Sequence, residues 1–549
     1  MKELRICVRK EFTMEQTNQN ANNPYLNNAN NATPQINSPY PAQTRVYTAQ
    51  KEDTVYTKRM KEHFSFFGIG SLLYAIFYTF CLYRNASGIT YPFFVIGTLC
   101  YFFFFMQKLG VPYKKDSVFY IVSIVLLGIS NCLTGSPQLL AMNKCGIFLL
   151  AFILMIHTVY LDKSWNFPKY FSALAQMTGI IFVCLFRPFG DMISYFDARK
   201  KNKDGKKSYF LPVLIGIVIA VPLLLFMTLL LASADAVFAS IFSRLLESIN
   251  FNTIFGTAFM TIMIFFASYA VIAAFGMKEV KEDITDHRTL EPIIAIIVTV
   301  TLSAIYLIFS VIQILYLFIG NMKLPDGYTY SSYAREGFFQ LLTVCILNLL
   351  IVLVCLYLFR DNTALKAILT VISGCTFIMI LSSALRMLMY INRYNLTFLR
   401  IFVLWSLAVI FLLMAGVTIS IYMNKFPLFT YSMIVVTVFY IGLSFSHPDY
   451  WIAKYNLSPQ HIEYLDEYDT RDSQKYIARL SSDAAPIILD EKLNPYLADY
   501  FAVLEDEDDM NDELLWLSRY HNKIQLLSEE MHLRNFNFSL HAAEKYLVQ

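Results

Sequence analysis

The chain has 549 residues, of which 56% are hydrophobic, 16% aromatic and only 15% charged, and its mean hydropathy is +0.48. Soluble chains of this length usually fold into several domains with about a quarter of their residues charged, so the composition excludes an ordinary soluble protein. The net charge of +3 is the sum of two unequal parts. Residues 1–446 carry 35 Lys and Arg against 21 Asp and Glu, whereas residues 447–549 carry 9 against 20.

Residues 1–60 are predicted to be a disordered N-terminal arm. Segment 16–50 is crowded with Asn, Gln, Pro, Thr and Tyr and has no apolar periodicity. Such a composition cannot bury enough surface to offset the entropy of ordering the backbone. No apolar run of a signal peptide follows the basic start. We interpret the arm as a solvated tail, with a partner-binding arm as the alternative.

Residues 61–446 contain apolar runs that are long enough, at about 17–30 residues, to cross a hydrocarbon core as helices. Strands are excluded because an open strand leaves backbone groups unsatisfied in lipid and the runs lack the alternation of a barrel. The prediction is an all-α polytopic membrane protein, with a first transmembrane bundle and basic loop at 61–208 and a second transmembrane domain at 209–446. The twelve candidate spans are 64–83, 89–107, 117–134, 146–161, 171–186, 209–232, 254–276, 292–320, 338–359, 364–391, 398–423 and 428–446.

The distribution of Lys and Arg predicts the orientation, because cytoplasmic loops carry the excess of both. From residue 187 onward, the loops on one side of the membrane carry thirteen Lys and Arg and those on the other side carry six. The first side is therefore expected to be cytoplasmic, and the chain after residue 446 to lie outside. The N-terminal arm is also expected in the cytoplasm, because it carries Lys51, Lys58 and Arg59 and is followed by Lys61. This requires an even number of spans before Arg187. We therefore expect 171–186 to lie in the interface or to re-enter, leaving eleven spans. The alternative is twelve spans and a cytoplasmic C-terminus.

Residues 447–549 are polar, acidic and rich in Tyr, and they are predicted to form a small helical C-terminal domain. Segment 513–530 has the periodicity of a helix with one buried stripe. The residues of that stripe are Leu514, Leu515, Leu517, Tyr520, Ile524 and Leu527.

The sequence offers no catalytic or metal-binding motif. The nine Cys form no CxxC pair, the eight His are scattered, and phosphate-loop, dinucleotide-binding and nucleophile-elbow motifs are missing. We therefore expect no catalytic residue, no metal, no cofactor and no nucleic-acid partner.

Charged side chains near membrane depth are the remaining candidates for a functional site. Burying a charge in lipid is costly, so such residues usually have a function. These side chains lie in four places along the chain, around Asp235, Arg335, Arg386 and Asp449. Each place is two spans from the next, so all four lie on the same side of the membrane. Arg386, Arg393 and Arg400 recur every seven residues and would form one stripe on a continuous helix. The whole cluster is Asp235, Arg335, Glu336, Arg386, Arg393, Arg400 and Asp449.

Three interpretations of this cluster remain open. Its charges could pair to fix the outer loops, or its Arg planes could bind an anionic group such as a lipid phosphate or a carboxylate. The third interpretation is a proton or ion path through Asp235. Gln313 and Asn348, inside their spans, could extend a pocket or join helices, and joining helices is favoured.

At these same residues the chain resembles a group of bacterial polytopic membrane proteins, domain of unknown function 4173 and its broader relative 4153. The matching stretches are LASADAVF (231–238), YAREGFFQL (333–341), SSALRMLMYINRYNLTFLR (382–400), HPDYWIAKYNL (447–457) and LSSDAAPIIL (480–489). Two departures are Asn395, where that pattern usually has Gly, and His447, where it usually has Asn. The resemblance implies an integral protein of the bacterial plasma membrane and supplies no substrate.

A non-enzymatic role is favoured: binding of a small anionic or lipid ligand at the outward-facing cluster, for transport or for sensing. Membrane lipids are the expected partners, and no protein partner is indicated. The alternatives are a membrane enzyme acting on lipid-linked substrates, with Asp235 or Asp449 as general base, and a membrane partner of a regulator.

Overall fold

The computed structural model describes most of the chain beyond the N-terminal arm. Its contacts divide the chain into Met1–Glu52 and Asp53–Gln549, and everything below concerns the second unit. The described residues are 54–85, 87–163, 165–202, 251–282, 288–315, 330–423, 425–462, 467–498, 500 and 514–547, with separate positions between 216 and 240. Only the backbone is described at 199–202, 251, 330–338, 393 and 467–469. The predicted span 209–232 therefore lies almost wholly outside the described residues.

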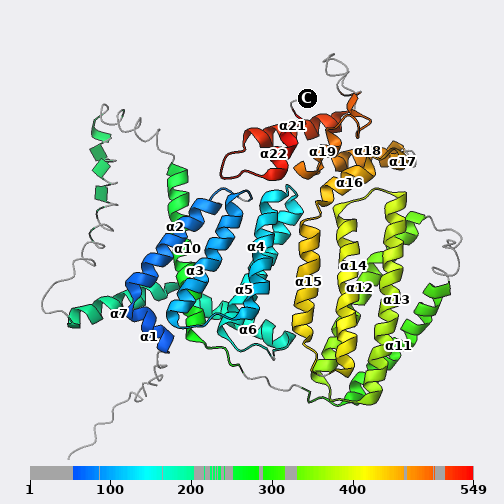
Figure 1. Cartoon of the computed structure of the whole chain (residues 1–549), viewed down its shortest axis with the longest axis horizontal. Helices are drawn as coiled ribbons and strands as arrows, with labels where there is room; N and C mark the ends of the chain where they lie inside the picture. Colours follow the sequence, from blue (N-terminus) through cyan, green and yellow to red (C-terminus); the bar gives the residue numbers. More distant parts are fainter. Residues whose placement is uncertain are drawn as a thin grey trace, which may run out of the picture. The chain divides into compact units, whose positions relative to one another are not determined.

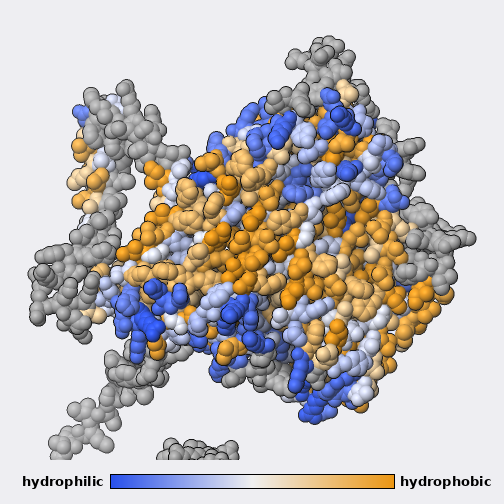
Figure 2. Space-filling view, in the orientation of Figure 1, coloured by the Kyte–Doolittle hydropathy of each residue, from blue (hydrophilic) through white to orange (hydrophobic). Residues whose placement is uncertain are grey.

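The described residues form an all-helical membrane protein, as predicted. They contain one isolated β-bridge, between Leu290 and Phe359, and no strand. Ten of their helices are long and apolar enough to cross a membrane, or eleven if Leu428–Ser444 and Pro448–Asn456, bent by 55°, make one span. Figure 2 shows hydrophobic side chains in a broad band across the middle of the helices, with hydrophilic residues at both ends. Such a band is what a hydrocarbon core requires.

The first group of spans packs its aromatic and aliphatic side chains around a core that includes Phe102, Tyr269 and Phe275. Local signals begin and end these helices: Pro137 occupies the first turn of α5, and Gly110, with φ of 95°, ends α3. The group consists of α2 (Phe64–Leu82), α3 (Thr90–Leu109), α4 (Val118–Leu133), α5 (Pro137–Val159) and α10 (Phe251–Met277).

The second group of spans is joined by packing and by a few polar contacts between helices. It consists of α11 (Pro292–Gln313), α12 (Tyr330–Leu358), α13 (Thr363–Arg393) and α14 (Phe398–Tyr422). The Asn348 amide donates to the Thr376 hydroxyl at 3.0 Å and so links α12 to α13, which is the joining role favoured for Asn348. Helix α15 (Leu428–Ser444) packs against both α14 and α4 and connects the two groups (Figure 1).

Both ends of α6 (Phe167–Val183) lie at the same end of the first group. The helix starts beside the loop that follows α5, where the Tyr170 hydroxyl donates to Asp162. It is followed by Cys184, whose sulfur lies 3.4 Å from that of Met277 at the end of α10. The ends of α5 and α10 meet there, since the amide of Val280 donates to the Tyr160 hydroxyl. This arrangement fits the expected interfacial or re-entrant segment, although the stretch is apolar enough to be counted among the ten.

Helix α1 (Val55–Glu62) includes residues 55–60, which the composition assigned to the arm. Two contacts order it: Met60 is 1% exposed, and the Arg59 guanidinium donates to the Leu109 carbonyl at 2.7 Å. Helix α7 (Arg187–Asn202) packs against α1, α2 and α10 at the same end of the bundle.

The C-terminal domain has a hydrophobic core of its own, built around Ile452, Ile488, Leu517 and Tyr520. Its helices are α16 (Pro448–Asn456), α17 (Pro459–Ile462), α18 (Glu467–Ile477), α19 (Ala485–Ile488), α21 (Leu515–Glu529) and α22 (Phe538–Glu544). Helix α21 is the helix predicted at 513–530, and its stripe is buried except at Leu515, which is half-buried, and at its C-terminal end. Leu527 there is 44% exposed because it lines a cavity.

Candidate ligand site beneath the C-terminal domain

The C-terminal domain contacts the loops at one end of the spans, which we name the capped end. These loops are 83–89, 134–136 and 394–397. The opposite end, with loops 110–117, 160–166 and 359–362, is named the open end. Figure 1 shows helices α16–α22 over the capped end.

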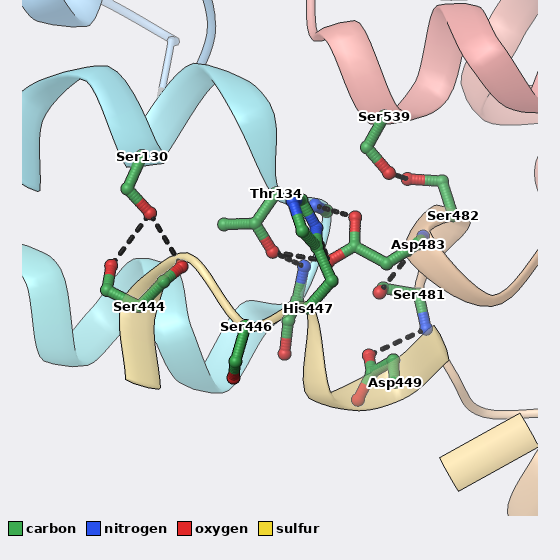
Figure 3. Close-up of polar contacts among 12 residues, drawn as sticks. Ser130, Thr134, Ser444, Ser446, His447, Asp449, Ser481, Ser482, Asp483 and Ser539 are labelled. Carbon is green, nitrogen blue, oxygen red and sulfur yellow. Dashed lines mark hydrogen bonds and ion pairs between the residues drawn. The ribbon is translucent and has the colours of Figure 1, made fainter. Parts of the chain in front are cut away.

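Asp483 fixes the domain to the loop between α4 and α5. It lies in a short 3₁₀ turn and accepts hydrogen bonds from the Thr134 hydroxyl at 2.5 Å and the Gly135 amide at 2.8 Å. His447 Nδ1 lies 3.3 Å from the same carboxylate, and Figure 3 shows Thr134 and His447 converging on it. Burial alone would raise the pKa of Asp483, but the hydrogen bonds from His447, Ser539 and Thr134 outweigh it and lower that pKa.

His447 occupies the bend between α15 and α16 in a left-handed conformation, with φ of 47°. Asn and His adopt this conformation more readily than most residues, which explains why either side chain suits this position. The hydrogen bond to Asp483 raises the pKa of the His447 imidazole.

A second attachment joins the loop between α2 and α3 to the segment between α21 and α22. The Asn85 amide donates to the Arg534 carbonyl at 3.1 Å, and the Arg534 guanidinium donates to the Tyr83 carbonyl. The backbones approach so closely that a Cβ on Gly88, which has φ of 133°, would lie 2.7 Å from the Cα of Asn535. Only glycine fits there without strain.

Between these two attachments lies the boundary cavity, with a volume of about 320 Å³. Three cationic side chains from separate segments line it: Arg84, Arg479 and Lys523. Glu530 is the one acidic residue among its lining residues. None of the three cations forms a salt bridge with a described carboxylate. An excess of positive charge without carboxylate partners in a concave site suits an anion.

Lys523 is held in place by the domain itself. Its ammonium donates to the carbonyls of Ala478, at 2.9 Å, and Leu480, and it lies 4.5 Å from the centre of the Tyr520 ring. Burial lowers its pKa to about 8. The side chain is therefore mostly charged at neutral pH and close to titration.

The structure places the predicted charged residues in separate surroundings. Arg386 is 7% exposed and donates to Gln313 at 3.2 Å, an oxygen shared with Ser382. Gln313 thus joins α11 to α13. The Arg400 guanidinium lies 4.1 Å from the centre of the Tyr390 ring.

Asp449 is also buried, at 3% exposure, and it accepts from the Ser481 amide at 3.1 Å. Asp235, in contrast, is exposed. The side chains of Arg335, Glu336 and Arg393 lie outside the described residues. Ligand binding by the predicted cluster therefore stays a prediction.

Sequence reasoning assigned no role to Asp483, Arg84, Arg479 or Lys523. Asp483 lies within the quoted stretch LSSDAAPIIL, and this stretch was the one available signal. Among the described residues no group of three or more His, Cys, Asp and Glu could hold a metal ion.

Fold and site together define a multi-pass helical membrane protein with a polar domain over one end of its spans. A family model matches residues 121–491. The chain belongs to that family, which is described as a domain of unknown function, DUF4153. Comparisons with curated proteins and with solved structures give no match.

Proposed function

We propose that the protein binds an anionic, phosphate-bearing ligand in the boundary cavity, for transport or for sensing. The observation that carries the proposal is the convergence of Arg84, Arg479 and Lys523 on one cavity that has a single acidic lining residue. Guanidinium groups match phosphate oxygens in bidentate geometry, and an ammonium adds a point charge. The ligand class is the one expected from the sequence, but the residues that bind it are different.

We also propose that the capped end is extracytoplasmic, in the plasma membrane of a bacterium. The open end carries the basic residues of α1, the end of α7 and the loops around Lys278 and Arg360, as expected of a cytoplasmic side. Both ends of α6 lie at the open end, which supports the eleven-span prediction, although its span 209–232 lies almost wholly outside the described residues. The five matching stretches support membership in the narrower 4173 family.

Binding of soluble anions to the full chain in neutral detergent tests the cavity. The probe is sn-glycerol 3-phosphate, measured by isothermal titration calorimetry. The double substitution R84Q and R479Q should weaken binding at least tenfold, because each charge-assisted hydrogen bond contributes about 1.5–3 kcal/mol. The matched control is R519Q, since Arg519 is an exposed residue of α21 that does not line the cavity. Equal affinities for the double variant and the control would refute the proposal.

A further inference from the structure

A second and larger cavity lies within the first group of spans, and we name it the tyrosine chamber. Its volume is about 640 Å³, within the range of about 300–1,000 Å³ typical of ligand pockets. Helices α2, α3, α5 and α10 form its walls, which include Tyr74, Tyr78, Tyr91 and Tyr101. Because all four helices are candidate spans, the chamber lies at membrane depth.

Two of the four tyrosines in the walls of the tyrosine chamber have their hydroxyls paired with neighbouring side chains. The Tyr74 hydroxyl is paired with Thr98 at 2.9 Å, and the Tyr101 hydroxyl with Ser71 at 2.8 Å. The Tyr74 and Tyr101 rings stack with their centres 4.2 Å apart. Apolar ring faces in lipid surroundings suit a hydrocarbon chain better than a polar solute.

Asn85 lines both the boundary cavity and the tyrosine chamber. It is 7% exposed, and its Nδ2 shares its two hydrogens among three nearby oxygens, those of Cys81, Thr90 and Arg534. Its Oδ1 accepts no hydrogen bond from a described residue. A buried carbonyl without a donor is costly. A hydroxyl group of a ligand that spans the two cavities would satisfy it.

Lys144 lines the chamber from α5 and forms no hydrogen bond or salt bridge with a described residue. It lies about 10 Å along the helix from Pro137, which is at the capped end. Helical side chains tilt toward the N-terminus of their helix, so we expect the ammonium of Lys144 to point toward the capped end, where Asn85 lies. A lysine at membrane depth favours an anionic partner.

We infer that the ligand is an anionic phospholipid, with its phosphate between the cations of the boundary cavity and Lys144, and an acyl chain in the tyrosine chamber. This inference rests on the proposed function and adds the lipid as the source of the phosphate. A free phosphate ester would use the boundary cavity alone. It would leave the tyrosine chamber without the acyl chain that the lipid supplies.

Affinity measurements with three probes separate the two sources of phosphate. The full chain in neutral detergent is titrated with dioleoyl phosphatidylglycerol, with its soluble dihexanoyl analogue and with sn-glycerol 3-phosphate. The long-chain lipid should bind at least tenfold more tightly than glycerol phosphate. Equal affinities would overturn the inference and leave the proposed function standing, whereas no binding of any probe would overturn both.

A bulky substitution on α5 tests whether the acyl chain occupies the tyrosine chamber. Ala151 lines the chamber and Ala141 is an exposed residue of the same helix that does not line it. A151W should weaken binding of the long-chain lipid at least tenfold and change glycerol phosphate affinity less than twofold, which also reports correct folding. A141W should change neither. Unaltered long-chain binding by A151W would overturn the inference.

A second substitution removes the charge of Lys144 without adding bulk. K144Q should weaken phosphatidylglycerol binding about tenfold, and K144R should retain it. Neither substitution should change the affinity for dioleoylglycerol, which carries no phosphate. Equal losses for K144Q and K144R would contradict a role for the charge and overturn the placement of the phosphate.

Discussion

Thr134 and Asp483 are 349 positions apart in the chain, yet the Thr134 hydroxyl donates to the Asp483 carboxylate at 2.5 Å. One residue ends a transmembrane helix and the other belongs to the C-terminal domain, so this contact couples the two. The boundary cavity lies between this attachment and the one at Asn85. Its shape therefore depends on how firmly the domain is held.

Substituting Asp483 with Asn should loosen the domain. The neutral amide weakens the charge-assisted bonds from Thr134, Gly135 and His447, each worth about 1.5–3 kcal/mol. Hydrogen–deuterium exchange at the Gly135 amide should therefore accelerate at least tenfold. D472N is the control, because Asp472 is exposed and pairs with Lys475 alone among the described residues. Equal exchange rates in the two variants would contradict the role given to Asp483.

Attachment of the domain should weaken as pH rises above neutrality. The pKa of His447 is raised in the folded protein, so its contribution is complete below the unfolded value of about 6.5 and is lost as pH rises through the folded pKa. The imidazole is 40% exposed, so solvent screening limits the effect to about 1 kcal/mol or less. Asp483, with its lowered pKa, stays ionised throughout this range and loses its contribution only in acid.

Exchange at the Gly135 amide between pH 6 and 8.5, corrected for the intrinsic exchange rate, measures this dependence. The substitution H447N should abolish the pH dependence, because Asn also accepts the left-handed backbone at this bend but does not titrate. A pH dependence that persists in H447N would assign the effect to another group.

The sequence predicted the spans well but not the site, and the reason is physical. Long apolar runs define helices locally: the run 428–446 corresponds to α15 (Leu428–Ser444), and 398–423 to α14. Which charged groups meet depends on contacts between distant segments, such as Asn85 with Arg534. Arg386 and Arg400 were expected on one stripe of a continuous helix, but α13 ends at Arg393 and Arg400 belongs to α14. The first pairs with Gln313 and the second stacks on Tyr390.

Ligand affinity should fall as pH rises through about 8. Lys523 has its pKa lowered to about 8 by burial, and above that pH it loses the charge that attracts an anion. Affinity for sn-glycerol 3-phosphate should fall several-fold between pH 7 and 9 in the natural protein. K523M should bind more weakly at pH 7 and show a flatter profile. An unchanged slope in K523M would exclude Lys523 from the site.

Substituting two glycines with alanine should change the thermal stability in opposite directions, because only one of them lies where the backbones at the domain boundary approach closely. G88A places a Cβ 2.7 Å from the Asn535 backbone at a positive φ, which should destabilise the protein by about 1–3 kcal/mol. G179A is the control, because that helical glycine has open space around it and alanine should stabilise the helix by about 0.5–1 kcal/mol. Thermal unfolding in detergent should shift in opposite directions. A G88A midpoint at or above that of the natural protein would contradict the close approach.

The side of the membrane occupied by the C-terminal domain decides whether the ligand site faces outward. The structure groups the loops at 83–89 and 134–136 with that domain, and the loops at 110–117 and 160–166 with the opposite end. The opposite end carries Lys114, Lys115 and Lys163, which favours the cytoplasm. A reporter fused after Gln549 should therefore be active only outside the cytoplasm, and one inserted in the loop 110–117 only inside. A cytoplasmic signal from the fusion after Gln549 would turn the boundary cavity inward and contradict the proposed orientation.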